Sequence, residues 1–145
     1  MAARLFFSIA CWMAFIHVAS AQTATDPSGI WLTEKGDARV HVSRCGAGIC
    51  GVVVWLRDPN NPVTGKPEVD DKNPNPALAK RPMIGLPLFI GMRSTSPGKW
   101  AGQIYNADDG GTYASKVAVT GPDTLRVEGC LGVFCGGETW SRFGR

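Results

Sequence analysis

Alternation of apolar and polar residues is the clearest pattern along this chain. Ala38, Val40 and Val42 alternate with polar residues, which is the period of two of a half-buried strand. Residues 49–56 are apolar almost throughout, which predicts a strand that is covered on both faces. The remaining apolar stretches predict further strands at 30–33, 88–93, 99–105, 112–120, 124–128 and 138–143.

The connections between most of these strands are short and rich in turn-forming residues. Glycine occurs at nearly every reversal, as in 34–37, 96–98, 106–111 and 121–123. Short turns join neighbouring antiparallel strands, so the fold class is all-β, as an up-and-down antiparallel β-barrel of about eight strands or as a sandwich. Periodicity alone does not choose between the two. A barrel of that size either fills its interior with side chains or holds one small ligand.

One connection, at 57–87, is long and rich in proline. Seven of the ten prolines lie in it, which excludes a central strand or a long helix. Asn75 as N-cap and Pro76 at the first helical position predict one short helical turn through Arg81, ended by Pro82. Loops of this length are often functional, and crossing the open end of a barrel is one such role.

The N-terminal residues have the pattern of a secretory signal peptide. Arg4 precedes an apolar run at 5–18, and Ala19-Ser20-Ala21 forms a small-x-small cleavage site. The pattern predicts a signal peptide at 1–21 and a single domain at 22–145, in a periplasmic or secreted protein. The apolar run is shorter than the roughly 20 residues that span a bilayer, and no later run reaches that length, so no integral membrane segment is predicted.

Charge is spread evenly along the chain. The 15 basic and 12 acidic residues form no basic cluster, which argues against nucleic acid as a partner.

Removal of the signal peptide, with Cys11, leaves four cysteines in two C-x4-C pairs. Zinc sites usually use shorter ligand spacings, and redox dithiols are usually C-x-x-C at a helix start, so neither a metal nor another cofactor is predicted. Glycines between the cysteines favour tight reversals that would bring each pair together across a hairpin. Three pairings are possible, and the one we expect joins Cys45 to Cys50 and Cys130 to Cys135.

Few residues offer catalytic chemistry. Once the signal peptide is removed, His41 is the one remaining histidine, and it lies on the polar side of an alternating strand. The adjacent carboxylates Asp108 and Asp109 are more typical of a turn than of a catalytic pair. No catalytic residue is assigned, and an enzymatic role stays an alternative.

Taken together, the motifs resemble the exported bacterial proteins grouped as domain of unknown function 2147. The resemblance covers nearly all of the chain after the signal peptide. It includes G-I-W-L-T (29–33), R-C-G-x-G-x-C-G-x-V-V-W-L (44–56), G-K-P (65–67), D-x-x-N-P (70–74), R-P-M-I-G-L-P (81–87), W-x-G-x-I-Y-N-x-x-D-G (100–110), T-Y (112–113), V-x-G-C-L-G (127–132) and G-x-x-W-S-R (137–142). This resemblance implies a lipocalin-like barrel with an internal cavity, but no activity and no catalytic residues.

The leading hypothesis is therefore a protein that binds a small, apolar or amphipathic ligand inside the barrel. Large aromatic residues on strands are first of all core material, and they are also the candidates for a cavity wall. Arg81, in the long loop, could hold an anionic head group. The candidate wall residues are Trp31, Trp55, Trp100, Tyr105, Tyr113 and Trp140.

Two alternatives are kept. One is a cell-envelope hydrolase that uses Asp70, Asp108 or Asp109 as acid or base, which requires at least two carboxylates to converge in a cleft. The other is a module that binds envelope proteins through an exposed apolar patch at 83–90.

Overall fold

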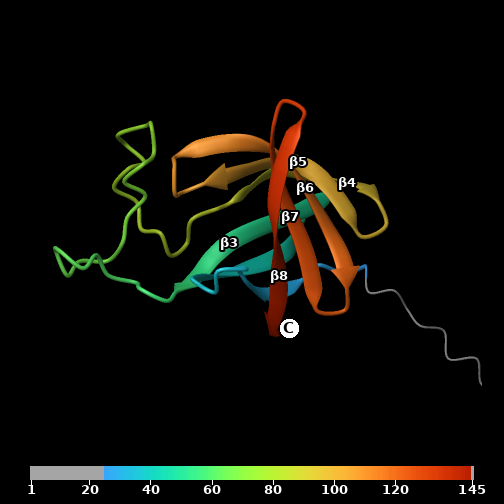
Figure 1. Ribbon diagram of the computed structural model, residues 1–145, viewed down its shortest axis with the longest axis horizontal. Coiled ribbons are helices and arrows are strands. Elements are labelled where there is room, and N and C mark those ends of the chain that lie inside the picture. Colours follow the sequence, from blue (N-terminus) through green and yellow to red (C-terminus); the bar gives the residue numbers. More distant parts are fainter. Residues whose placement is uncertain (1–24, 145) are drawn as a thin grey trace, which may run out of the picture.

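Eight strands form a closed antiparallel barrel in the computed structural model, which describes residues 25–144 (Figure 1). Each strand pairs with the next, and β8 closes the barrel on β1, so the predicted barrel is confirmed and a sandwich is excluded. The predicted signal peptide lies outside the described residues. The strands are β1 (Gly29–Leu32), β2 (Ala38–Cys45), β3 (Gly48–Leu56), β4 (Phe89–Ser96), β5 (Lys99–Asn106), β6 (Gly111–Gly121), β7 (Thr124–Leu131) and β8 (Phe134–Gly144).

The up-and-down order gives the barrel two distinct ends. The β1–β2, β3–β4, β5–β6 and β7–β8 connections share one end, which we call the mouth end. The β2–β3, β4–β5 and β6–β7 connections share the other, together with the start of β1 and the end of β8, and we call it the closed end.

Most of the buried core lies at the closed end and in the middle of the barrel. Inward-facing residues of successive strands interlock there, and the rings of Phe89 and Trp140 stack with centroids 6.0 Å apart. Burying each such large side chain contributes about 1.5–3 kcal/mol. The cluster comprises Trp31, Val40, Val42, Ile49, Phe89, Met92, Trp100, Val117, Leu125, Val127 and Trp140.

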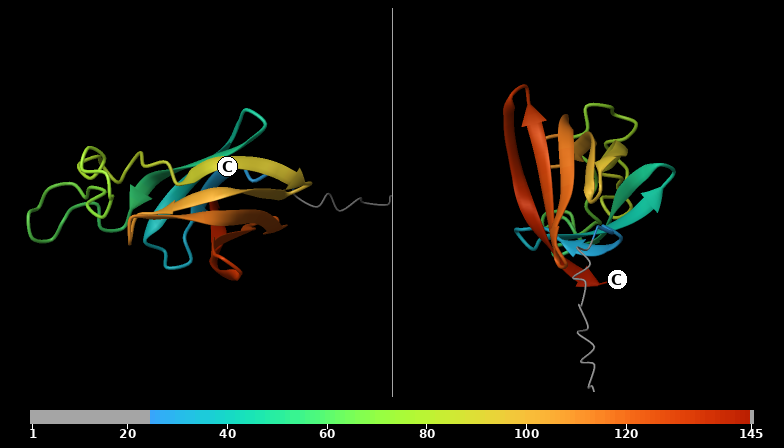
Figure 2. Two further views of the ribbon diagram at one scale, coloured as in Figure 1. Left: turned by 90° about the horizontal axis from the view of Figure 1, so that it is seen from above. Right: turned by 90° about the vertical axis from the view of Figure 1, so that its right-hand side faces the viewer.

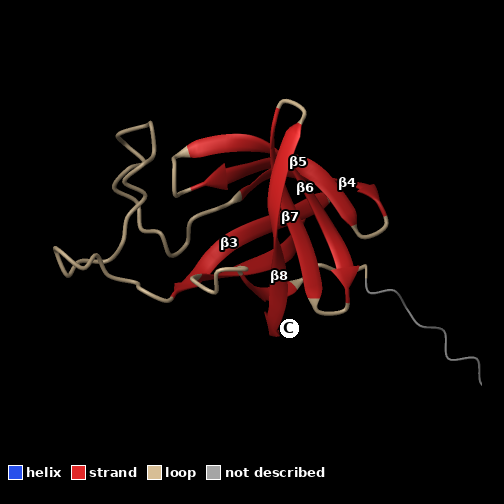
Figure 3. Cartoon of the chain, viewed as in Figure 1, coloured by secondary structure: helices blue, strands red, loops and turns tan. Residues whose placement is uncertain are grey.

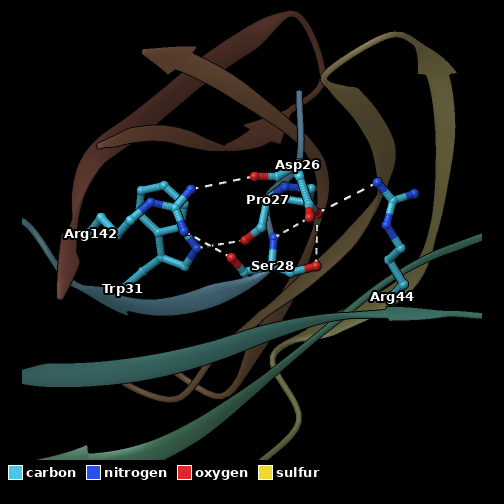
Figure 4. A network of polar contacts seen from close by, with 6 residues as sticks. All are labelled: Asp26, Pro27, Ser28, Trp31, Arg44 and Arg142. Atoms are coloured by element: carbon cyan, nitrogen blue, oxygen red, sulfur yellow. Dashed lines mark hydrogen bonds and ion pairs between the residues drawn. The ribbon is translucent and has the colours of Figure 1, made fainter. Parts of the chain in front are cut away.

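The segment before β1 covers the closed end through the network in Figure 4. The indole N–H of Trp31 donates to the Pro27 carbonyl over 2.8 Å, and the Arg142 guanidinium lies 4.2 Å from the Trp31 ring. Arg142 also donates to the Ser28 carbonyl at 2.8 Å. Hydrogen bonds from Trp31 and Arg142 to backbone carbonyls therefore hold this segment over the closed end of the barrel.

Asp26 stabilises this segment. Its carboxylate accepts from the Ser28 hydroxyl at 2.8 Å and from the Ser28 N–H at 3.1 Å, and it lies 3.5 Å from Arg44 (Figure 4). The two Ser28 hydrogen bonds, with smaller contributions from Arg44 and Arg142, lower the pKa of Asp26 below its usual value of 3.8.

The two predicted disulfides are both formed, but in different registers. Cys130 and Cys135 are paired directly across β7 and β8, with Cα atoms 4.0 Å apart. The expectation that the cysteines face each other is wrong for the other pair, where Cys45 pairs with Gly48 and the Cα atoms of Cys45 and Cys50 are 5.8 Å apart. The turn starts at once after Cys45 but one residue later after Cys130, so the same spacing gives two registers.

The β3–β4 connection, residues 57–88, extends away from the barrel in Figures 1 and 3. Isolated bridges between Asn60 and Pro67 and between Val69 and Pro82 hold it together. The predicted short helix is not formed: the Asn75 side chain accepts from the Ala77 N–H as expected of a cap, but only turns follow before Pro82. Within residues 25–144 there is no helix at all, and hence none that could cross a bilayer.

Candidate functional site: a cavity at the mouth end of the barrel

A cavity of about 850 Å³ opens at the mouth end. Its wall takes residues from the β1–β2, β3–β4 and β5–β6 connections and from strands β7 and β8, as expected for a space enclosed by the barrel rim. The volume lies within the range of pockets that hold a small organic molecule. The apolar part of the lining comprises Val53, Leu56, Met83, Leu88, Ile104, Tyr105, Val127 and Trp140.

Side-chain size along β7 and β8 explains why the space is there. On the inner face of β7, Leu125 and Val127 are followed toward the mouth by Gly129. On the inner face of β8, Trp140 is followed toward the mouth by Glu138 and then Gly136. Large residues thus fill the barrel toward the closed end, and glycines leave space toward the mouth end. The two strands lie side by side at the red end of the colour scale in Figure 2 (right).

Charged residues surround the opening. Two are lysines, and each has an acidic partner: Lys35 lies 3.6 Å from Asp108, and Lys72 lies 3.3 Å from Asp71. The acidic residues of the lining outnumber the lysines, and they are Asp37, Asp58, Glu68, Asp71, Asp108 and Glu138.

Glu138 brings a carboxylate inside the barrel. Its side chain is half-buried, and it accepts a hydrogen bond from the Trp140 indole N–H at 2.9 Å. The charge is therefore fixed against the aromatic part of the cavity wall.

The long loop is anchored to the barrel by a buried carboxylate, Asp70, which is 1% exposed. The Tyr105 hydroxyl donates to it at 2.6 Å, the Asn73 amide at 2.8 Å, and the Arg81 guanidinium at 2.9 Å. Burial first, and then the hydrogen bond to Asp70, raise the pKa of Tyr105. Every oxygen of this buried carboxylate thus has a donor, as a buried charge requires.

A second contact brings the loop against the β5–β6 connection. Gly110 has a positive φ of 74°, and any Cβ at this position would collide with the Lys72 carbonyl. Only glycine allows the loop backbone to approach so closely. The loop therefore forms one wall of the cavity.

The structure separates the aromatic residues that the sequence singled out. Tyr105 and Trp140 line the cavity. Trp31 and Trp100 belong instead to the buried core of the closed end.

The remaining candidates also lie away from the cavity lining. The Trp55 ring centroid lies 4.1 Å from the Arg39 guanidinium carbon. A bulge in the β2–β3 pairing places Trp55 opposite Arg39, so both side chains lie on the same face of the sheet. Tyr113 bonds to Asp109 at 2.8 Å. Arg81, expected to receive an anionic head group, has its guanidinium committed to Asp70.

The carboxylates of the hydrolase alternative are each engaged in structural contacts. Asp70 holds the loop, and Asp108 pairs with Lys35. Asp109 accepts from the Gly111 N–H at 2.7 Å, which with the Tyr113 hydroxyl lowers its pKa. His41 is exposed on β2, and residues 25–144 contain no cluster of side chains able to hold a metal ion.

Exposed apolar residues occur near the cavity as well. In the patch proposed at 83–90, Ile84 and Ile90 are 49% and 43% exposed. A more exposed group lies at the tip of the β7–β8 hairpin, where Leu131, Val133 and Phe134 are 74%, 90% and 81% exposed.

Sequence reasoning missed the acidic rim and the anchoring role of Asp70. The rim residues are scattered over three connections and strand β8, so no local pattern marks them. Asp70, Asn73 and Arg81 did stand out as motif residues, and the structure gives the reason: all three meet at Tyr105.

Comparison with known proteins agrees with this fold. A family model described as "Uncharacterized protein conserved in bacteria (DUF2147)" matches residues 29–142. A solved structure of protein HP1028 from Helicobacter pylori, described as belonging to the lipocalin family, is similar with a TM-score of 0.69 and 22% identity over 81% of this chain and 83% of that one. At that identity the similarity shows the fold alone. No curated protein matches the chain.

Proposed function

The chain belongs to the bacterial DUF2147 family, and we propose that it binds one small, largely apolar ligand in the cavity at the mouth end. The observation that carries the proposal is the 850 Å³ space with an apolar wall, inside a barrel whose other end is fully packed. Eight-stranded barrels have an interior of the size that encloses one small ligand.

Apolar burial would supply most of the affinity. Each Å² of ligand surface removed from water contributes about 25 cal/mol before the costs of association. The rings of Tyr105 and Trp140 offer the largest flat surfaces of the wall. The loop anchored at Asp70 would form one side of the ligand site, because Glu68, Val69 and Met83 line the cavity.

We place this binding outside the cytoplasm. The signal-peptide pattern at 1–21 supports export, and the two disulfides are typical of an oxidising compartment.

A blocking variant tests the proposal. Gly136 lines the cavity, and a Cβ added there meets no atom within 4 Å, so Gly136→Phe places a ring in open space rather than in the packed wall. Gly144 is the matched control, since its Cβ also meets nothing within 4 Å and it does not line the cavity.

The assay uses the fluorescence of N-phenyl-1-naphthylamine, an uncharged lipophilic probe, during titration of protein that has lost its signal peptide. We expect saturable binding by the wild type and by Gly144→Phe, and binding at least about tenfold weaker in Gly136→Phe. Equal binding by both variants, or no saturable binding by the wild type, would overturn the proposal.

A further inference from the structure

We infer that the ligand of this cavity is a cationic amphiphile, with a protonated amine or quaternary ammonium group held at the mouth and an apolar part inside. The inference rests on the proposed function and names the chemical class that the mouth end selects. It departs from the anionic head group that Arg81 suggested.

The charge of the mouth is the first argument. Both lysines of the lining are neutralised by Asp108 and Asp71. The four other carboxylates, Asp37, Asp58, Glu68 and Glu138, make no ion pair within residues 25–144. The excess is local, because the chain as a whole carries a net charge of +3. Unpaired carboxylates around an apolar space raise the local concentration of cations and repel anions.

The position of Arg81 is the second argument. An anionic ligand needs a cation that is free to bind it, and Arg81 is the residue that the sequence suggested for this role. Its guanidinium instead makes two contacts of 2.9 Å to Asp70, a carboxylate with no exposed surface. Recruiting Arg81 would leave that buried carboxylate without its counter-ion, which strongly disfavours an anionic ligand.

The cavity wall also contains groups that suit a cation. Tyr105 and Trp140 present aromatic rings, which attract ammonium groups through their faces. Glu138 lies beside Trp140 and is held there by the indole N–H. An ammonium group between the rim and these rings would meet both a carboxylate and a ring face.

The test compares ligands that differ only in the head group. Dodecylamine and dodecanoate, each below its critical micelle concentration, and dodecanol, below its solubility limit, compete at pH 7 with N-phenyl-1-naphthylamine on wild-type protein. We expect dodecylamine to displace the probe at a concentration at least about tenfold lower than dodecanol does, and dodecanoate to be the weakest. Added salt should weaken the binding of the amine and leave that of the alcohol unchanged.

A variant without two of the lining carboxylates tests whether these charges cause the preference for the amine over the alcohol. Asp58→Asn combined with Glu68→Gln should reduce the advantage of the amine over the alcohol about threefold or more. Glu128→Gln is the control, because Glu128 lies outside this cavity and pairs with Arg126. Equal binding of the three ligands, or tighter binding of dodecanoate, would overturn the inference and leave the proposed function intact. If none of them displaces a bound probe, or the probe itself does not bind, the proposed function fails as well.

Discussion

The two ends of this barrel are built by the same strands but have opposite interiors. At the closed end, Trp31, Val42 and Leu125 are fully buried in one hydrophobic core. At the mouth end, the inner positions of β7 and β8 are Gly129, Glu138 and Gly136, and a cavity of about 850 Å³ remains. β7 and β8 stay paired from Thr124 and Ser141 to Leu131 and Phe134, so on these two strands the difference comes from side-chain size. This barrel thus has room for a ligand at its mouth end because large core side chains do not extend to that end.

The largest expected effect is on stability, and it compares a side chain of the packed closed end with a side chain of the cavity wall. Leu125→Ala removes a fully buried side chain at the closed end and should reduce the free energy of unfolding by about 2–5 kcal/mol. Leu88→Ala, at the cavity wall, should cost about 1 kcal/mol, because that side chain is only partly buried. Urea denaturation measures both values. Equal losses would contradict the distinction between a packed end and a hollow one.

The next effect concerns the loop. Asp70→Asn leaves Arg81 without its buried counter-ion and should weaken loop anchoring by about 3 kcal/mol, which corresponds to a roughly 100-fold higher open population. Trypsin cleavage at Lys72 or Lys80 should speed up accordingly. Asp71→Asn is the matched control, since Asp71 is 64% exposed and only pairs with Lys72. Unchanged cleavage in Asp70→Asn would show that other contacts hold the loop.

A smaller effect is expected from removing the disulfides, one of which lies at each end of the barrel. Replacing either pair by serine should cost about 2 kcal/mol of stability, since both close equally short loops. Only the Cys130/Cys135 double variant should also weaken probe binding, because Gly129 and Gly136 of the cavity wall flank that pair. Loss of binding in the Cys45/Cys50 double variant instead would contradict the location of the site.

The smallest effect is a pH dependence at the closed end. The folded-state pKa of Asp26 is lowered, so its contribution is present above the unfolded value of about 3.8 and is lost as pH falls through the folded value. The pair is largely exposed, which limits the effect to less than about 1 kcal/mol. Thermal unfolding at pH 7 and pH 3 should therefore differ slightly less in Asp26→Asn than in the wild type. An identical difference would show that Asp26 does not support the segment.

Local patterns in the sequence predict most of the fold. Apolar stretches, alternating with polar residues in 38–43, marked all eight strands, and glycine marked most of their turns, because both patterns depend on neighbouring residues. Cysteine spacing predicted both pairs but not their registers, which depend on where Gly46 and Gly132 start the turn.

The candidate site was less predictable because it depends on distant residues. Trp31, Trp100 and Trp140 look alike in sequence, yet only the last one reaches the cavity. The pairing of Arg81 with Asp70 also joins residues whose side chains meet only after the loop folds. Barrel closure, rather than any local motif, decides which side chains share the interior.

The central claim is that the mouth end binds a ligand while the closed end stays solid. It is tested most directly by backbone amide chemical shifts of labelled protein during titration with dodecylamine. We expect saturable shifts at Val127, Gly129 and Gly137, which line the cavity, and none at Val42 and Val117. Shifts centred on Val42 and Val117, or no saturable shift anywhere, would contradict it.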